Sequence, residues 1–509
     1  MSMQGADICT VTNGWRVSLP SLNEMTYERF SAALLGEVDQ LGRVAAYFAV
    51  PTAGNELELF AVVARDWKGD LRLLRTRITR GFPSLTPRCP QLHLFEREIA
   101  EQYGVVPEGH PWFKPVRFHR AWRAGVDAWG RDPARHPVPG DMEFYRVEGE
   151  EVHEVAVGPV HAGVIEPGHF RFQCQGEKVM HLEISLGYQH RGLEQQLVGG
   201  PGPTTIHQME TIAGDTTIGH ASAYCQALER LAGVETSPRA AALRALALEL
   251  ERLANHVGDI GALAGDVGFL PTAAFCGRIR GDYLNLTAEL CGSRFGRGLV
   301  RPGGVAFDVS RQLADQLLLR LEAIERDTRG AVELFFDTPS VLARLEGTGR
   351  VTVDAAESLG LVGMAARACG LAIDARLHHP AGAYRDAFDH VVIEEDGDVF
   401  ARANIRRREI YDSLGWVKRA LRTLPEGELR RELPALAPGS LAVSLVEGWR
   451  GEVVHVALTD AQGKFSRYKI VDPSFRNWSG LAMALRGEQI SDFPLCNKSF
   501  NLSYCGFDL

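Results

Sequence analysis

The pattern of apolar and polar positions begins with a strand-rich region. Up to about residue 125, the runs "RVAAYFAVPT", "ELELFAVVARD" and "LRLLRTRI" alternate with polar turns and predict strands. The segment "QLHLFEREIAEQYG" then shows helical spacing and ends at Gly104, as a helix with a glycine cap does. Strands followed by a helix predict a small α+β domain over residues 1–125.

The stretch "RAGVDAWGRDPARHPVPGD" is rich in Gly, Pro and charge, and we interpret residues 126–145 as a linker. The alternating segment after it predicts a small β region. From about 190 to 330 the spacing is helical. The run "AALRALALELERLANHVGDIGALAGDVGF" is apolar on several faces, which predicts a core helix of a bundle.

Further helices are expected between about 350 and 425, and "GSLAVSLVEGWRGEVVHVALTDAQGKFSRYKIVDPS" predicts strands and hairpins. We therefore expect a second domain over residues 146–509, with a helical bundle core and small flanking β regions. The fold class predicted for the whole chain is α+β.

Composition narrows the class of protein. The chain of 509 residues carries a formal net charge of −9, which disfavours non-specific nucleic-acid binding, so we expect no nucleic-acid partner. No run reaches the roughly 18 to 20 apolar residues of a membrane helix, and no signal-peptide pattern opens the chain. We expect a cytoplasmic protein, with docking on a membrane partner left open.

Cysteine spacing and glycine motifs exclude several kinds of site. The nine cysteines include no Cys-x-x-Cys pair, which favours reduced thiols in the core and argues against a zinc or iron–sulfur site built by this chain alone. Neither a G-x-G-x-x-G after a strand nor a G-x-x-x-x-G-K-[ST] occurs, so no nucleotide cradle is predicted.

Two motifs carry clustered titratable groups. In "GPVHAGVIEPGHFRF", His161, Glu166 and His169 lie close together in the sequence, which suits either a proton relay or a solvated hairpin. In "GYQHRGLEQQL", the cluster is His190, Arg191 and Glu194, and the four-residue spacing of His190 and Glu194 allows an interaction across one helical turn. A structural ion-pair network is the alternative for this second motif.

A third motif places charge on an apolar helix. Glu249, Arg252 and His256 in "ELERLANHVGDIGALAGDVGF" fall on one face of a helix of Leu, Ala and Val. Charge in such a place is costly unless it is paired, so we expect buried polar function or a partner contact. In "AGDTTIGHASAY", Thr216 and Thr217 precede an Ala-rich run as helix-capping hydroxyls do.

These motifs, with "GSRFGRGLVRPGGV", resemble the large subunit of membrane-bound, complex I-related nickel–iron hydrogenases and its relative that lines the quinone cavity of complex I. The segment "FEREIAEQYGVVPEGHP" is similar to the small accessory subunit of complex I. The resemblance covers nearly the whole chain. It implies a fusion of both subunits, as in the formate hydrogenlyase large subunit, and a hydrogenase large-subunit fold for residues 146–509.

In the hydrogenases of this family, two Cys-x-x-Cys pairs hold nickel and iron, which are thiophilic. By the resemblance, the first pair falls seven and four residues before His220, at Ala213 and Thr216, and the second falls in "SYCGFDL", at Ser503 and Gly506. None of these positions is a cysteine, and the chain ends at Leu509 without the extension of hydrogenase precursors. The resemblance thus implies no metal held by this chain.

A quinone remains a candidate ligand by the same resemblance. In complex I a tyrosine of the loop before this helix and a histidine of the first hairpin serve quinone reduction, but the tyrosine position falls on Gly214 here. The NADH site of complex I lies on a flavin subunit, so an NAD label describes the assembly and not this chain.

The resemblance implies an oxidoreductase subunit on the cytoplasmic membrane face that couples electron transfer to ion translocation, without its own nickel–iron centre. Its partners would be an iron–sulfur small subunit, which holds the cluster, and membrane-embedded antiporter-like and anchor subunits. A non-catalytic coupling subunit is the alternative, and an active hydrogenase is the less favoured one. The expected relay is formed by His161, Glu166, His169, His190, Arg191, Glu194, Asp215 and His220, and Arg294 and Arg301 are expected to stabilise the cavity's charge on the side of the iron–sulfur partner.

Overall fold

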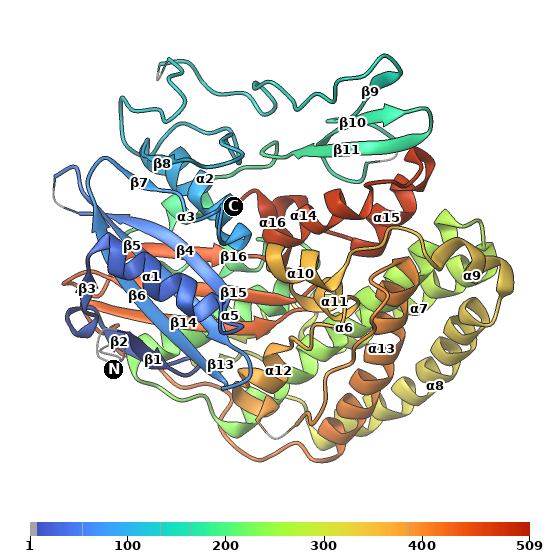
Figure 1. Cartoon of the computed structure of the whole chain (residues 1–509). Helices are drawn as coiled ribbons and strands as arrows, with labels where there is room; N and C mark the ends of the chain where they lie inside the picture. Colours follow the sequence, from blue (N-terminus) through green and yellow to red (C-terminus); the bar gives the residue numbers. More distant parts are fainter. Residues whose placement is uncertain (1–7, 53, 133, 163, 386) are drawn as a thin grey trace.

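The computed structural model describes residues 8–52, 54–132, 134–162, 164–385 and 387–509. An N-terminal sheet, a C-terminal sheet and a helical bundle lie side by side, and a third, smaller sheet lies at one end (Figure 1). The expected α+β class is confirmed by this mixture of helices and separate, mainly antiparallel sheets.

The N-terminal sheet has the strand order β1-β6-β5-β4, with β3 parallel to β6. Its three long strands are the runs predicted from the sequence. Helix α1 packs on these strands, and α2 packs on β4 and ends at Gly104, which has a left-handed φ of 68° as the sequence predicts. The elements are β1 (Cys9–Val11), β3 (Glu24–Met25), α1 (Tyr27–Val38), β4 (Arg43–Pro51), β5 (Leu57–Arg65), β6 (Asp70–Ile78), β7 (Gly81–Pro83), α2 (His93–Tyr103) and β8 (Val106–Glu108).

The C-terminal sheet has the order β16-β15-β14-β2, and β4 of the N-terminal sheet packs against β15 and β16. Strand β4 therefore has neighbours on both faces, which explains why "RVAAYFAV" is almost continuously apolar. Strand β2 comes from within the predicted N-terminal domain but pairs with β14. The elements are β2 (Arg16–Ser18), β14 (Ser440–Glu447), β15 (Glu452–Thr459) and β16 (Phe465–Val471).

Four long helices form the bundle, and α6 lies at its centre (Figure 1). Leu246, Ala247 and Leu248 follow one another in α6 and so point to different sides of the helix, yet all three are buried, as predicted for a core helix. Helix α5 packs against β14 and β15 and so joins the C-terminal sheet to the bundle. The four bundle helices are α6 (Pro238–Asp266), α7 (Leu270–Cys291), α8 (Arg311–Phe336) and α13 (Val399–Arg422), and the joining helix α5 is Thr217–Ala232.

The third sheet, β11-β10-β9, lies at the top in Figure 1 and corresponds to the predicted small β region. Among the described residues of 126–145 there is no helix or strand. The remaining elements are short: β9 (Val152–Val157), β10 (His169–Gln175), β11 (Lys178–Ser185), α3 (Leu193–Gln196), α4 (Thr205–Met209), β12 (Val300–Arg301), β13 (Gly304–Val305), α9 (Pro339–Leu345), α10 (Val353–Leu359), α11 (Gly363–Arg367), α12 (Ala375–His378), α14 (Pro473–Ala484), α15 (Phe493–Phe500) and α16 (Tyr504–Phe507).

Candidate functional site

The loop before α5 begins the site, and a carboxylate from another helix caps α5. Glu251 of α6 accepts hydrogen bonds from the backbone N–H groups of Ile218 (2.7 Å) and Gly219 (3.2 Å). The Thr216 hydroxyl makes no capping hydrogen bond to the helix, and the Thr217 hydroxyl donates back to a carbonyl of the preceding segment. The expected threonine cap is therefore wrong, because Glu251 already satisfies the free N–H groups.

Asp215, one residue earlier, forms a bidentate ion pair with Arg450. The two nitrogen–oxygen distances are 2.6 and 2.7 Å, and the Arg450 guanidinium lies over the Trp449 ring. The Asp215 carbonyl accepts hydrogen bonds from the Trp449 indole and the Asn255 amide. These contacts hold the loop against α6 and the β14–β15 turn.

A line of four buried side chains runs from the start of α5 through the C-terminal sheet. His220 Nε2 lies 3.0 Å from Asp472 Oδ2, His220 Nδ1 lies 3.1 Å from His455 Nε2, and His455 Nδ1 lies 2.8 Å from the Tyr468 hydroxyl. With both imidazoles neutral, one assignment of hydrogens satisfies every contact: Tyr468 donates to His455, His455 to His220, and His220 to Asp472.

The electrostatics of this line agree with that assignment. Burial and the neighbouring His220 hold the pKa of His455 well below its usual value, so its imidazole is neutral. Burial alone would raise the pKa of Asp472, but the hydrogen bond from His220, together with the positive charge of Arg450, outweighs burial and lowers it. Asp472 is therefore the ionised end of the line.

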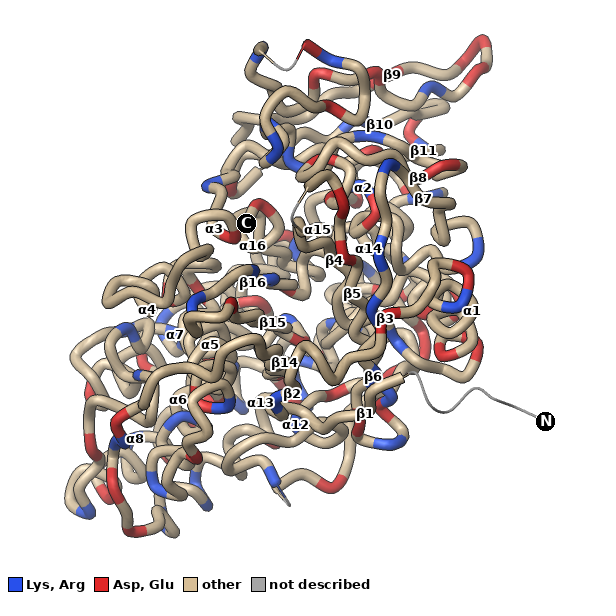
Figure 2. Tube along the Cα trace, turned by 90° about the vertical axis from the view of Figure 1, so that its left-hand side faces the viewer, with Lys and Arg blue, Asp and Glu red and all other residues tan. Residues whose placement is uncertain are grey.

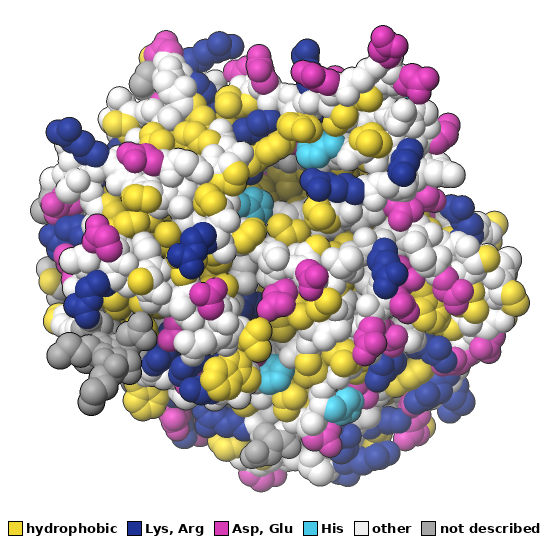
Figure 3. Space-filling model, in the orientation of Figure 1, with side chains coloured by type: hydrophobic (Ala, Val, Ile, Leu, Met, Phe, Trp, Pro, Cys, Tyr) yellow, Lys and Arg dark blue, Asp and Glu magenta, His cyan; other side chains and the backbone are white. Residues whose placement is uncertain are grey.

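The C-terminal tail closes the site from the other side. Ser503 caps α16 by accepting a hydrogen bond from the Gly506 N–H at 2.9 Å. Asp508 accepts hydrogen bonds from the backbone N–H groups of Gly187 and Gln189 at 2.7 and 2.9 Å. Figure 3 shows that this face of the molecule is hollowed below the β9–β11 layer, where hydrophobic side chains gather.

The four positions that the family resemblance assigns to metal ligands do not supply a thiolate set. Ala213 and Gly506 have no donor side chain, and the hydroxyls of Thr216 and Ser503 already make hydrogen bonds within the protein. A Cβ added at Gly506 would lie 2.6 Å from Cγ of Asp472. Within the described parts of the chain, no group of three or more His, Cys, Asp or Glu side chains is arranged to hold a metal ion. These residues do not fit a nickel–iron centre.

Two buried carboxyl groups of the site titrate near neutral pH. Burial raises the pKa of Glu251 to about 8, although the two N–H groups that it accepts oppose the rise. Burial likewise raises the pKa of Asp508 to about 7, against the N–H groups and the charge of Arg117. Both groups can take up or release a proton under ordinary conditions.

The first histidine motif spreads over a loop and a strand. His161 is exposed, whereas Glu166 accepts a hydrogen bond from the Gln189 side chain at 2.8 Å. His169 is buried at the start of β10, where Arg171 donates to its Nε2 and Gly158 supplies a carbonyl to its Nδ1. Burial lowers the pKa of His169, so its imidazole is neutral near pH 7. Glu166 thus faces the segment that follows β11, near the tail.

The second motif is divided between two environments. His190 stacks on His119 with ring centroids 4.5 Å apart, and burial together with His119 lowers its pKa to about 3. Arg191 donates to the carbonyls of Thr211 and Ile212, just before the site loop. Glu194 is directed elsewhere.

Glu194 belongs to an ion network that joins the N-terminal domain to β16. It pairs with Arg467 at 2.8 Å and Lys469 at 3.1 Å, and Lys469 also lies 2.6 Å from Glu98 of α2. Burial would raise the pKa of Glu194, but Lys469 and Arg467 lower it to about 2. Glu194 therefore pairs with Arg467 and Lys469, which agrees with the alternative of a structural ion-pair network for this motif. Its hydrogen bonds do not include His190.

Arg294 and Arg301 lie beyond α7. Arg301 pairs with Glu210 at 2.8 Å, and Glu210 also accepts the Gly298 N–H, so this arginine fixes α4 to the 298–305 turn. Arg294 is exposed just after the end of α7. The Arg301–Glu210 ion pair and the Gly298–Glu210 hydrogen bond both lie outside the site loop and the tail.

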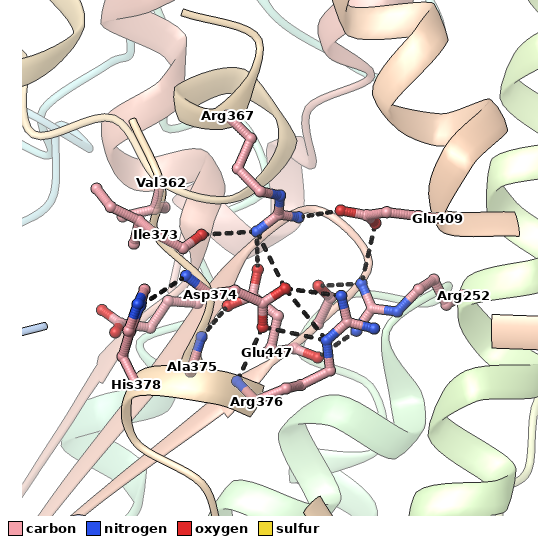
Figure 4. Close-up of polar contacts among 12 residues, drawn as sticks. Arg252, Val362, Arg367, Ile373, Asp374, Ala375, Arg376, His378, Glu409 and Glu447 are labelled. Carbon is pink, nitrogen blue, oxygen red and sulfur yellow. Dashed lines mark hydrogen bonds and ion pairs between the residues drawn. The ribbon is translucent and has the colours of Figure 1, made fainter. Parts of the chain in front are cut away.

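The third motif lies in a buried charge network (Figure 4). Arg252 pairs with Glu249 at 3.2 Å, and His256 lies 2.7 Å from Glu409 of α13. The charges on this face are buried and paired, as the cost of unpaired buried charge requires, and the expected polar function or partner contact stays a prediction. The other members come from distant segments: Arg367, Asp374, Arg376 and Glu447.

This network contains four carboxylates and only three arginines. Figure 4 shows Arg367 between Glu409 and the carboxylates of Asp374 and Glu447, while Arg376 pairs with Asp374. Burial, followed by the charge of Asp374, raises the pKa of Glu447 to about 7 despite its 2.8 Å contact with Arg367. Arg367 also pairs with Glu409 at 2.6 Å, so the three arginines do not balance the charge of all four carboxylates. Glu447 therefore holds a proton more readily.

Sequence reasoning missed six residues that build the site: Glu251, Arg450, His455, Tyr468, Asp472 and Asp508. Two signals could have found part of this set. Asp472 precedes a proline at a helix start, which is a capping pattern, and His455 interrupts an otherwise apolar strand. The contacts of the other four are set by the tertiary fold.

Charge is mixed over the whole molecule. Figure 2 shows Lys and Arg interspersed with Asp and Glu along the trace. In the part of the chain that the structure describes, no helix combines the length and apolar character that crossing a membrane requires.

Comparison with known proteins identifies the family. Residues 31–142 match the family model described as the respiratory-chain NADH dehydrogenase 30 Kd subunit, and residues 266–440 match that of the 49 Kd subunit. Hydrogenase-4 component G of Escherichia coli (strain K12) is 30% identical over 471 residues, which are 91% of this chain and 80% of that protein. NADH-quinone oxidoreductase subunit 4 of Thermus thermophilus is 29% identical over 384 residues, 70% of this chain and 94% of that protein.

A solved structure has the same fold. A chain of the membrane-bound sulfane sulfur reductase, an archaeal respiratory membrane complex, aligns with a TM-score of 0.67 and 24% identity, covering 72% of this chain and 100% of that chain. The resemblance inferred from the motifs is thereby confirmed for both halves. The chain belongs to the family of oxidoreductase subunits shared by respiratory complex I and the complex I-related group 4 hydrogenases, in the form that fuses the 30 Kd-like and 49 Kd-like parts.

Proposed function

We propose that this chain is the large subunit of a membrane-associated, complex I-like oxidoreductase that works without a nickel–iron centre of its own. It lies peripherally on the cytoplasmic membrane face, between an iron–sulfur small subunit and membrane-embedded antiporter-like and anchor subunits. Relatives named as a component of hydrogenase-4 and as part of an archaeal respiratory membrane complex support membership of a membrane complex. Its role is to couple electron transfer in the partner to ion translocation.

The observation that carries the proposal is the state of the four ligand positions. Nickel and iron need several thiolates, whereas these positions offer a methyl group, a glycine and two hydroxyls that are already hydrogen-bonded. The place of a side chain at Gly506 is filled by the Asp472 carboxylate, which His220 and the Ser474 N–H hold in position. A cysteine at Gly506 would require Asp472 to move.

The same site retains groups that hold protons. The line from Tyr468 to Asp472 is continuous and buried, so a proton added at one end can be accommodated by reversing the hydrogen bonds along it. Glu251 and Asp508 flank this line with pKa values of about 8 and about 7. These residues replace the motif histidines and Glu194 as the proposed relay.

Metal analysis of the purified native complex tests the proposal. We expect no nickel per copy of this subunit and no hydrogen-dependent dye reduction, with the iron of the complex accounted for by the iron–sulfur partner. Stoichiometric nickel together with hydrogen turnover would refute it.

A second candidate function is a non-catalytic coupling subunit, favoured by how completely the site side chains are hydrogen-bonded to one another. Tyr468→Phe separates the two candidates, because it removes the hydroxyl that faces His455. Tyr283→Phe is a matched control, since it removes a buried hydroxyl contact of 2.9 Å to Thr328 in the bundle.

The readout is the pH dependence of the partner cluster's midpoint potential in the assembled complex. A relay predicts a potential that falls with pH by up to about 59 mV per unit, a slope that Tyr468→Phe reduces and Tyr283→Phe leaves unchanged. Equal slopes in both variants and the wild type would favour the coupling subunit.

A further inference from the structure

The 30 Kd-like part of the chain reaches the site through a short segment that follows α2. Residues 116–119 lie within the stretch that matches the 30 Kd family model. Glu101 of α2 fixes this segment with one carboxylate. It accepts the backbone N–H groups of Val116, Arg117 and Phe118 at 3.2, 2.9 and 2.6 Å. Phe118 has a left-handed φ of 57°, a conformation that is uncommon for so large a side chain and that these hydrogen bonds hold. The position of the segment is therefore set by α2.

The Arg117 side chain extends from this segment to the C-terminal tail. Its Nε donates to the Phe507 carbonyl at 2.7 Å, and its guanidinium lies over the rings of Phe475 and Phe507, 5.2 and 5.7 Å from their centroids. Arg117 is buried and also pairs with Glu98 of α2. The contact with the Phe507 carbonyl fixes the backbone of the tail directly before Asp508.

The backbone of the same segment contacts the loop that binds Asp508. Gly187, with a φ of 106°, packs so closely on this segment that a Cβ there would lie 2.4 Å from the Arg117 carbonyl oxygen. The Gly187 N–H is one of the two that Asp508 accepts. Farther along the loop, His190 stacks on His119 of the segment. Residues 116–119 thus contact both the tail and the loop on which the tail is held.

The charge of Arg117 acts on Asp508. Asp508 accepts its hydrogen bonds from backbone N–H groups, which carry no net charge. Burial raises the pKa of Asp508 to about 7; Arg117 opposes this rise, whereas Glu101 adds to it. Tyr188 is neutral beside this carboxylate, because burial and Asp508 raise its pKa above the usual value. Arg117 is therefore a cation that favours the ionised form of Asp508.

We propose that Arg117 is a positioning residue of the site, supplied by the 30 Kd-like part, and that the site is incomplete without it. Its guanidinium holds the tail at Phe507 and places a positive charge near Asp508, which flanks the proposed relay. The inference rests on the proposed function for the role of Asp508, and on the contacts alone for the holding of the tail. The 30 Kd-like part thus has a role in the site as well as in assembly.

Two substitutions of Arg117 separate its charge from its place in the fold. Arg117→Gln removes the charge, while Glu98 keeps a second cation, Lys469, at 2.6 Å, so no buried carboxylate loses all its partners. Arg117→Lys keeps a positive charge at this position. Arg239→Gln is the matched control, because Arg239 is also buried and bonds a carboxylate and backbone carbonyls at the start of α6.

Hydrogen–deuterium exchange of the assembled complex tests whether Arg117 holds the tail. In Arg117→Gln, the amides of residues 185–190 and 503–509 should exchange about tenfold faster, because Phe507 loses its donor and Asp508 its fixed position. The same amides should exchange at the wild-type rate in Arg239→Gln. Wild-type exchange in Arg117→Gln would overturn the proposal.

The pH dependence of the partner cluster's midpoint potential tests the role of the charge. Without the positive charge, Asp508 should keep its proton to higher pH. In Arg117→Gln the pH-dependent range of the potential should therefore move upward by about one unit, and Arg117→Lys should restore most of the shift. An unshifted range in Arg117→Gln, or an equal shift in Arg117→Lys, would contradict the proposal. A wild-type potential that does not change with pH would instead refute the relay of the proposed function, and the exchange experiment would still decide whether Arg117 holds the tail.

Discussion

At the residue scale, the undercompensated carboxylate of the buried charge network has a measurable consequence. Glu447 is 2% exposed and has a folded-state pKa of about 7, well above its usual 4.5. The folded protein therefore keeps a proton that the unfolded chain releases as the pH rises from about 4.5. Stability supplied by this group is present at low pH and is lost as the pH rises through 7.

Glu447→Gln should remove this dependence, because glutamine stays neutral. As the pH rises from 4.5 to 8, the free energy of unfolding of the variant should increase by about 3 kcal/mol relative to that of the wild type, at 1.36 kcal/mol per pKa unit. Urea unfolding at both pH values measures it, and the exposed Glu357→Gln serves as control. A constant difference across this range would contradict the assignment.

Single-residue reasoning reached only one side of this network. Helical spacing places Glu249, Arg252 and His256 on one face of α6, and their burial in an apolar helix requires partners. The partners Glu409 and Arg376 lie more than a hundred residues away in the sequence, so no local pattern reveals them. The same limit explains why the contacts of Glu251 were not predicted while its neighbours were singled out.

At the element scale, α6 is a helix with almost no solvent face. It contacts α5, α7, α13 and α15, so its leucines are buried on several sides. Long elements of this kind were the best predicted, because their periodicity extends over many residues. Short helices such as α11 and α12 are not predicted one by one, because four or five residues are too few to show the helical spacing of apolar positions.

Burial on α6 predicts a large cost for truncation. Leu253→Ala should lower the free energy of unfolding by about 2 to 5 kcal/mol, because Leu253 is fully buried at 0% exposure and a cavity would remain. Leu319→Ala on α8, where the side chain is 71% exposed, should change it by no more than about 0.5 kcal/mol. Urea denaturation of both variants tests the contrast, which would fail if the two shifts were similar.

At the scale of the whole molecule, buried ion pairs join the N-terminal domain to the C-terminal sheet. Lys469 of β16 lies 2.6 Å from Glu98 and 3.1 Å from Glu194, and Arg43 of β4 lies 2.6 Å from Glu452 of β15. The sequence indicated two domains, and their boundary stays a prediction. No sequence pattern indicates this contact surface, because the charged residues that form it come from segments far apart in the chain.

Lys469→Met should therefore destabilise the whole chain. Removing the ammonium leaves two buried carboxylates short of a partner, which costs about 3 kcal/mol. The exposed Lys464→Met, in the β15–β16 turn, should cost far less. Chemical denaturation checks the prediction, and equal midpoints for the two variants would disprove it.

Strand β2 has a consequence for how this protein is made. Ser18 pairs with Ser440, so the edge strand of the C-terminal sheet is synthesised more than 400 residues before its partner strand. At about 5 to 20 residues per second, that segment waits roughly 20 to 85 s for its partner strand to be synthesised. A gene divided within residues 126–145 would put the two paired strands on separate polypeptides. The halves could then complete the sheet only by associating with each other, and neither half alone would carry all four of its strands.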